Sequence, residues 1–202
     1  MSKPIPEQVV VWRIGGKGGS VRSQDEYTAH SGYNLLCRTN QQYLTYVKHS
    51  HGLGGINLGY ISNPAEKKVH FRLPDGRERE VLTGEPVALG IGGSPSWLQY
   101  ASQPVGINLK YNDKPLYEWY FYGPSGAKSE PIQTDSWIAI INERVRPEPD
   151  FLVYMDRPGA DVGWTTSPEF WDAVKTLLAE GIGQVADSYL KPAQGKQPTS
   201  TT

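Results

Sequence analysis

The sequence predicts an all-β domain made of three similar units, each with four short strands, followed by a single helix. The first observation is composition: 22 Gly and 16 Pro among 202 residues make up about a fifth of the chain, against a usual share of about 12%. The second is an excess of strand-forming aromatics, with 12 Tyr and 6 Trp. The third is an internal repeat. Together these favour short strands separated by turns over a helical bundle.

Charge and cysteine content exclude several classes of function. The chain has 20 basic and 21 acidic side chains and a formal charge of −1, whereas nucleic-acid-binding domains are normally basic, so we expect no nucleic acid partner. One cysteine, Cys37, allows neither an intramolecular disulfide nor an all-cysteine metal site. The sequence contains no apolar run of membrane-spanning length and starts without a secretory h-region, so we expect a cytoplasmic protein. Release by a leaderless route stays open.

The repeat is carried by a tetrad of the form aromatic–Leu–x–Tyr, which occurs at residues 43–46, 97–100 and 151–154. The closing tyrosines, Tyr46, Tyr100 and Tyr154, are 54 residues apart in both intervals. Equal spacing of a whole tetrad indicates a tandem triplication. It predicts that Leu44, Leu98 and Leu152, the second residues of the tetrads, have equivalent surroundings.

Each unit supplies its elements in the same order. A first strand ends at a Gly-containing turn, an apolar second strand follows, the tetrad is the third strand, and a Gly-led fourth strand ends in an aromatic residue. These segments are rich in β-branched and aromatic residues, are bounded by Gly, Pro, Asn and Asp, and are too short for helices. The first strands are residues 9–14, 69–73 and 117–122, the second are 34–37, 86–89 and 137–142, and the fourth are 55–60, 106–111 and 159–164.

With this architecture the chain resembles the β-trefoil superfamily over residues 8–165. One four-stranded unit of about 50 residues cannot bury its own apolar face, whereas three units around one axis share a core. The resemblance implies that six strands form a barrel and six form a cap of hairpins. It also implies sugar sites that recur once per unit, as in many β-trefoil lectins. Residues 1–7 are expected to be a flexible N-terminus.

Residues 166–190 predict a C-terminal α-helix. Ser167 and Pro168 suit its N-cap and first position, and Glu169 suits the positive end of the helix dipole. The apolar stripe of this helix is expected to pack on the β domain, with a homodimer contact as the alternative. Residues 191–202 are expected to form a disordered polar tail. The stripe is formed by Phe170, Trp171, Val174, Leu177 and Leu178.

No pattern of catalytic or metal-binding residues is present, so we expect a non-enzymatic protein without cofactor or metal. The Gly-rich residues 15–20 fit a hairpin turn and depart from a phosphate-binding loop. His49 and His51 are expected in a solvated loop, the alternative being a metal or pH-sensitive contact. Cys37 lies in an apolar strand, which predicts a buried, unreactive thiol.

The candidate binding site is the repeated fourth-strand motif, Gly–x–Asn/Asp–x–x–aromatic. Strand alternation places Ile56, Leu58 and Tyr60 on one face and Asn57 on the other. The structural interpretation is that the aromatics fill the core and the polar side chains hold a turn. The functional interpretation is a shallow pocket in each unit, where an amide or carboxylate and a ring bind the hydroxyls and C–H faces of a glycan or glycoprotein. The ligand-binding candidates are Asn57, Tyr60, Asn108, Tyr111, Asp161 and Trp164.

The runner-up is a protein-interaction or protease-inhibitor module. Residues 20–32 and residues 142–150 form connections that are longer than their counterparts in the other units, and loops diverge where function requires it. Pro147 and Pro149 would stiffen the second of these loops and so reduce the cost of ordering it on binding.

Overall fold

The computed structural model contains twelve β-strands and one short 3-10 helix, η1 (Glu7–Val9), in the part of the chain that it describes. That part comprises residues 4–5, 7–16, 18–24, 32–47, 57–64, 68–92, 97–101, 109–142, 150–154 and 162–165. The expectation of an all-β domain with antiparallel sheets is therefore confirmed. The predicted C-terminal helix and the polar tail lie outside the described residues. No helix among the described residues is long and apolar enough to cross a membrane.

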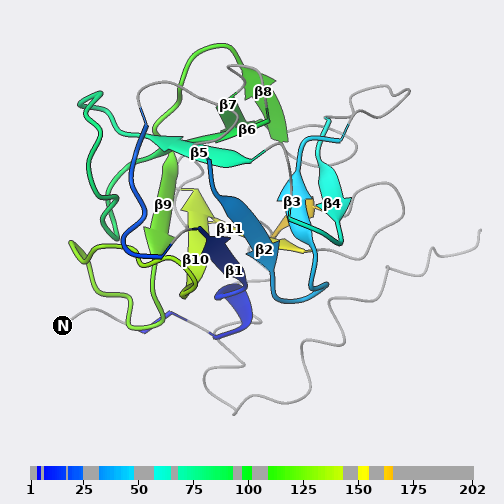
Figure 1. The fold of residues 1–202 in the computed structure, drawn as a ribbon, viewed down its shortest axis with the longest axis horizontal. Coiled ribbons are helices and arrows are strands. Elements are labelled where there is room, and N and C mark those ends of the chain that lie inside the picture. The colour runs from blue at the N-terminus through cyan, green and yellow to red at the C-terminus, as the bar shows by residue number, and fades with distance from the viewer. Residues whose placement is uncertain are drawn as a thin grey trace, which may run out of the picture.

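The strands, drawn as arrows in Figure 1, form one eight-stranded sheet and one four-stranded sheet. In chain order they divide into three groups of four that match the three sequence units. In every group each strand pairs antiparallel with the next one along the chain. Unit one comprises β1 (Trp12–Gly15), β2 (Asn34–Cys37), β3 (Tyr43–Thr45) and β4 (Gly59–Ile61). Unit two comprises β5 (Val69–Arg72), β6 (Ala88–Ile91), β7 (Trp97–Tyr100) and β8 (Leu109–Asn112). Unit three comprises β9 (Trp119–Tyr122), β10 (Trp137–Asn142), β11 (Asp150–Tyr154) and β12 (Val162–Thr165).

Strand register is the same in all three units. The tetrad leucine lies opposite the aromatic residue of the fourth strand each time: Leu44 opposite Tyr60, Leu98 opposite Tyr111, and Leu152 opposite Trp164. The three leucines are 1%, 0% and 0% exposed. Their surroundings are therefore equivalent, as the 54-residue spacing predicts.

Neighbouring units are joined by one recurring contact. The first strand of a unit pairs with the start of the second strand of another unit, through Val69 with Tyr33 and through Trp119 with Val87. The third contact joins the two ends of the described fold, because β1 pairs antiparallel with β10 and Arg13 lies opposite Trp137. The three units therefore form a closed ring.

A cycle of three backbone hydrogen bonds also joins all three units. The Val21 N–H donates to the Ile132 carbonyl (2.7 Å), the Ile132 N–H to the Val81 carbonyl (3.0 Å), and the Val81 N–H to the Val21 carbonyl (2.8 Å). Each residue follows the first strand of its own unit, and their exposures are 0%, 3% and 0%. Since each unit gives one donor and one acceptor, no pair of units completes the set without the third.

Two buried indoles fasten adjacent units to each other. The Trp12 Nε1–H donates to the Leu152 carbonyl (2.7 Å) and the Trp119 Nε1–H to the Leu98 carbonyl (2.9 Å). In both cases the first strand of one unit binds the tetrad of another. Val69 takes the equivalent place in unit two and has no side-chain donor, so this junction lacks the indole hydrogen bond and keeps the backbone bonds between Val69 and Tyr33. The repeat is thus equivalent in backbone and not identical in side chains.

Several strands start later than the sequence patterns predict. β6 begins at Ala88, two residues after the expected start, because Pro86 has no N–H to donate to a ladder. Unit one opens with η1 (Glu7–Val9), and β1 starts only at Trp12. The fourth strands begin after their Gly–x–Asn/Asp segments rather than within them.

Candidate functional site

The structure describes three of the six predicted site residues with their side chains. Asn57 precedes β4, while Tyr60 and Tyr111 lie within β4 and β8. Trp164 lies in β12, but its side chain is outside the described part. Asn108 and Asp161 lie outside the described residues altogether. The arrangement is therefore built from units one and two.

The fourth-strand aromatics share a face with core residues. Leu58 and Leu109, two residues before Tyr60 and Tyr111, are 6% and 0% exposed, and both tyrosines pack against the buried core while remaining half-buried. The alternation expected for these strands is thus present. It directs the rings toward the core, against which they pack while part of each side chain stays exposed.

Asn57 fastens two tyrosines that come from different units. Its Nδ2 donates to the Tyr46 hydroxyl (2.9 Å), and its carbonyl accepts from the Tyr111 hydroxyl (3.1 Å) and from the Val47 N–H (3.3 Å). Each such bond contributes about 1 kcal/mol net. The Asn57 side chain is therefore bonded to a tyrosine of its own unit, and its backbone carbonyl links that unit to unit two.

Aromatic rings meet across this junction and across the junction between units one and three. The Tyr46 and Tyr111 ring centroids are 6.3 Å apart at 33°, and those of Tyr60 and Tyr154 are 5.5 Å apart and edge-to-face at 73°. In both pairs the tetrad tyrosine of one unit contacts the fourth-strand aromatic of another. The corresponding residues of the third junction are Tyr100 and Trp164, of which Trp164 has no described side chain.

The junction keeps the Tyr111 hydroxyl protonated. Burial raises the pKa of Tyr111, and the nearby Tyr46 phenol raises it further. The hydroxyl is consequently a hydrogen-bond donor throughout the neutral range. Together with the Tyr46 hydroxyl and the Asn57 amide, it forms a half-buried group of polar atoms between two aromatic rings.

The sequence analysis did not assign the tetrad tyrosines to the candidate site, although Tyr46 and Tyr154 contact the fourth-strand aromatics. Tyr46 and Tyr154 close two of the repeated tetrads, and their recurrence at a fixed period was the available signal. The pattern identified them as strand residues. Their contacts with the fourth strands depend on how the units pack, which periodicity does not specify.

Other candidate groups have structural roles. Cys37 is fully buried, and desolvation raises the pKa of its thiol, as the apolar strand predicts. Gly18 and Gly19 have φ angles of 83° and 88°, which suits the turn expected at residues 15–20. No group of three potential metal ligands occurs within the described residues. His49 and His51 lie outside them.

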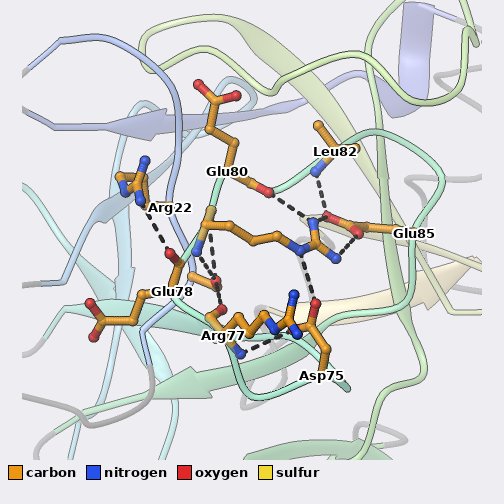
Figure 2. A network of polar contacts seen from close by, with 9 residues as sticks. Arg22, Asp75, Arg77, Glu78, Glu80, Leu82 and Glu85 are labelled. Carbon is orange, nitrogen blue, oxygen red and sulfur yellow. Dashed lines mark hydrogen bonds and ion pairs between the residues drawn. The ribbon is translucent and has the colours of Figure 1, made fainter.

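A charged cluster ties unit two to unit one (Figure 2). The Arg79 guanidinium binds Glu85 through both terminal nitrogens (3.1 and 2.8 Å) and Asp75 through Nε (3.0 Å), while Glu85 also accepts from the Leu82 N–H (2.6 Å). The Arg22 guanidinium reaches the Glu78 carbonyl from unit one (3.1 Å). The Arg77 N–H and the Arg79 guanidinium hold the pKa of Asp75 below its usual range. The Arg79 guanidinium and its two carboxylate partners satisfy one another, which marks a structural network.

Comparison with protein-family models, with curated proteins and with solved structures finds no match.

Proposed function

We propose that the protein is a non-catalytic binding protein that recognises carbohydrate at the junctions between its units. The observation that carries the proposal is the half-buried group formed by Tyr46, Asn57 and Tyr111, which combines two aromatic rings with two hydroxyls and an amide. Saccharides present hydroxyl edges and apolar C–H faces, and this combination of groups suits both.

The repeat supports weak binding at several places. Tyr60 and Tyr154 form a second ring pair at another junction, so ligand contacts can recur around the ring. A branched or repeating glycan that engages two junctions gains affinity by avidity, without any further contact within one site.

The proposal is tested by a glycan array with the full chain and three variants. Tyr46→Phe and Tyr111→Phe remove one hydroxyl each and keep the rings, while Asn57→Ala removes the amide. We expect at least about a tenfold loss of glycan signal in each, the usual effect of losing a satisfied polar contact. Tyr33→Phe is the matched control, because its hydroxyl accepts from the Arg22 N–H (2.8 Å) in a different part of the fold. The absence of binding to any neutral glycan, or unchanged binding by all three variants, rejects the proposal.

A protein partner is the second candidate, favoured by the unequal connections between strands. The connection from Gly15 to Asn34 in unit one is longer than those from Arg72 to Ala88 and from Tyr122 to Trp137. In unit three the link between β10 and β11 is longer than its two counterparts. Deleting residues 144–148 tests this candidate: capture of a protease or other protein partner is expected to fall, while glycan binding stays the same.

We also propose that the three units are arranged as a β-trefoil. The 54-residue period and the cyclic hydrogen bonds of Val21, Val81 and Ile132 support a threefold axis. A trefoil barrel additionally requires hydrogen bonds between first and fourth strands. The first and fourth strands of each unit are not neighbours in the pairing order, which comprises one eight-stranded and one four-stranded sheet. A crystal structure of the full chain tests the proposal: hydrogen bonds between first and fourth strands support the trefoil barrel, and their absence rejects it.

A further inference from the structure

Two arginines lie over one indole ring where unit three meets unit one. The Arg13 guanidinium carbon lies 5.2 Å from the Trp137 ring centroid, and that of Arg38 lies 5.6 Å from it. Both distances are within the range of cation–π attraction, which holds each guanidinium over the aromatic ring. Two positive charges are therefore placed around a single half-buried side chain.

Rigid elements hold all three side chains. Arg13 and Trp137 are direct cross-strand neighbours in the β1–β10 pair. Arg38 follows β2, and its N–H donates to the Val11 carbonyl (2.7 Å). The turn after Arg38 is fixed by the Gln41 side chain, which donates to the Arg38 carbonyl (2.6 Å). The backbone positions from which both arginines extend are therefore fixed before a ligand binds.

The charges of this cluster are only partly compensated. Arg38 forms one contact with a carboxylate, from Nη1 to Glu7 Oε1 at 3.3 Å, and the two side chains are 46% and 73% exposed. Such an exposed pair is weak and screened by salt. Within the described residues Arg13 has no ion pair with a carboxylate. Asp135, which precedes β10, lies beside Gly15 instead.

We propose that Arg13 and Arg38 form a binding site for an oxyanion, namely a sulfate, phosphate or carboxylate group. A guanidinium presents a planar set of donors that matches the oxygens of these groups and binds them in bidentate fashion. Cation–π attraction to Trp137 holds both guanidiniums near the same ring. The site takes an anion whose oxygens reach both guanidiniums at the edge of the indole.

The site is single, in contrast to the repeated junctions proposed for carbohydrate. The position of Arg13 in unit one is occupied by His70 in unit two and by Tyr120 in unit three. Strand register shows the equivalence, because the partners on the second strands are Leu36 for Arg13, Gly90 for His70 and Ile141 for Tyr120. Among the described junctions, the seam between β10 and β1 is therefore the one with two arginines. The inference goes beyond the proposed function and is tested separately from it.

The test is isothermal titration of the full chain with inorganic sulfate and inorganic phosphate at constant ionic strength in chloride. We expect one saturable site with a Kd below about 10 mM. Arg13→Gln and Arg38→Gln are each expected to weaken binding by at least about tenfold, since each removes one charged donor group. Arg77→Gln is the matched control, because Arg77 is an exposed arginine away from the seam, and it is expected to bind as the unchanged chain does.

A second titration identifies the source of the anion. A sulfated hexasaccharide that binds at least about tenfold tighter than inorganic sulfate indicates an anion carried by a saccharide, and equal affinity indicates a free ion; both results support the site. Absence of saturable binding by sulfate and phosphate overturns the proposal, as does binding that survives in both variants. If Arg13→Gln fails to fold, the more exposed Arg38→Gln decides the outcome by itself. Loss of neutral glycan binding, by contrast, bears only on the junction tyrosines.

Discussion

Gly90 is the residue at which unit two departs most from its counterparts. In the other units the equivalent positions are Leu36 and Ile141, opposite Arg13 and Tyr120. In unit two the partner is His70, whose imidazole lies over Gly90 and meets the Trp97 ring at a centroid distance of 4.8 Å. A buried histidine occupies the space that a side chain fills elsewhere.

Gly90→Ala is therefore expected to destabilise the protein by about 2 kcal/mol or more, because the added methyl group overlaps a buried ring that cannot move aside. The free energy of unfolding in urea measures this. Gly123→Ala is the matched control, since its added methyl group would meet no atom within 4 Å beyond its chain neighbours, and it is expected to change stability by less than about 0.5 kcal/mol. Equal losses in the two variants would contradict the packing argument.

His70 is also expected to make stability depend on pH. Burial lowers the pKa of His70 to about 4, whereas the unfolded chain has the ordinary value near 6.5. The unfolded state therefore takes up a proton first as the pH falls from 6.5 to 4, and the stability present above pH 6.5 is lost over this window. The loss amounts to about 3 kcal/mol by pH 4.

Urea unfolding between pH 7 and pH 4 measures this dependence. Because carboxylates also titrate at the lower end, the comparison is with His70→Gln, which cannot take up a proton. We expect the curve of the variant to be flatter over the window. Parallel curves for the two proteins would show that His70 does not titrate as its burial requires.

At the scale of elements, the first strands hold neighbouring units through side chains that differ from unit to unit. β1 and β9 place a buried indole against a tetrad carbonyl, through Trp12 and Trp119, while β5 places Val69 there. The junctions are thus alike in backbone pairing and differ in the side chain at this position.

Trp119→Phe is expected to cost about 1–3 kcal/mol, because it leaves the buried Leu98 carbonyl without its indole donor and opens a small gap. Trp137→Phe is the control. Within the described part of the chain, this half-buried ring is held by cation–π contacts with two arginines and not by a buried indole hydrogen bond. The free energy of unfolding of this variant is therefore expected to fall by less than about 1 kcal/mol. Denaturant midpoints of the two variants provide the comparison. A larger loss for Trp137→Phe would show that the seam, and not the buried bond, limits stability.

At the scale of the whole molecule, the ring of units predicts that the three tetrad leucines are interchangeable in energy. Leu44→Ala, Leu98→Ala and Leu152→Ala each remove a fully buried side chain from the shared core, so each is expected to cost about 2–5 kcal/mol. Leu82→Ala, at a partly buried position, is the control with a smaller effect. A loss under about 1 kcal/mol for one tetrad leucine alone would indicate that its unit packs separately.

The same ring predicts a single cooperative unfolding transition. The hydrogen bonds among Val21, Val81 and Ile132 require all three units at once, so no unit is expected to persist when another opens. Far-ultraviolet circular dichroism and tryptophan fluorescence are expected to give coincident urea transitions. Two separate transitions would show that the units unfold one by one.

The triplication, the all-β class and the strand order are readable from the sequence because they are local and repeated. The tetrads fix the third strands almost to the residue, and the leucine spacing anticipates three equivalent core positions. The starts of the strands were less predictable, since Pro86 and the Gly-led segments shift the first ladder hydrogen bond without changing the hydrophobic pattern.

The tertiary structure alone decided what lies between the units. Asn57 meets Tyr46 and Tyr111, and the guanidiniums of Arg13 and Arg38 both lie over the Trp137 ring, yet the members of neither grouping are adjacent in sequence. A periodic pattern records which face of a strand is buried, because burial is a property of each position. Contacts across junctions depend on the distances and angles at which the units pack, and those are set only when the ring closes.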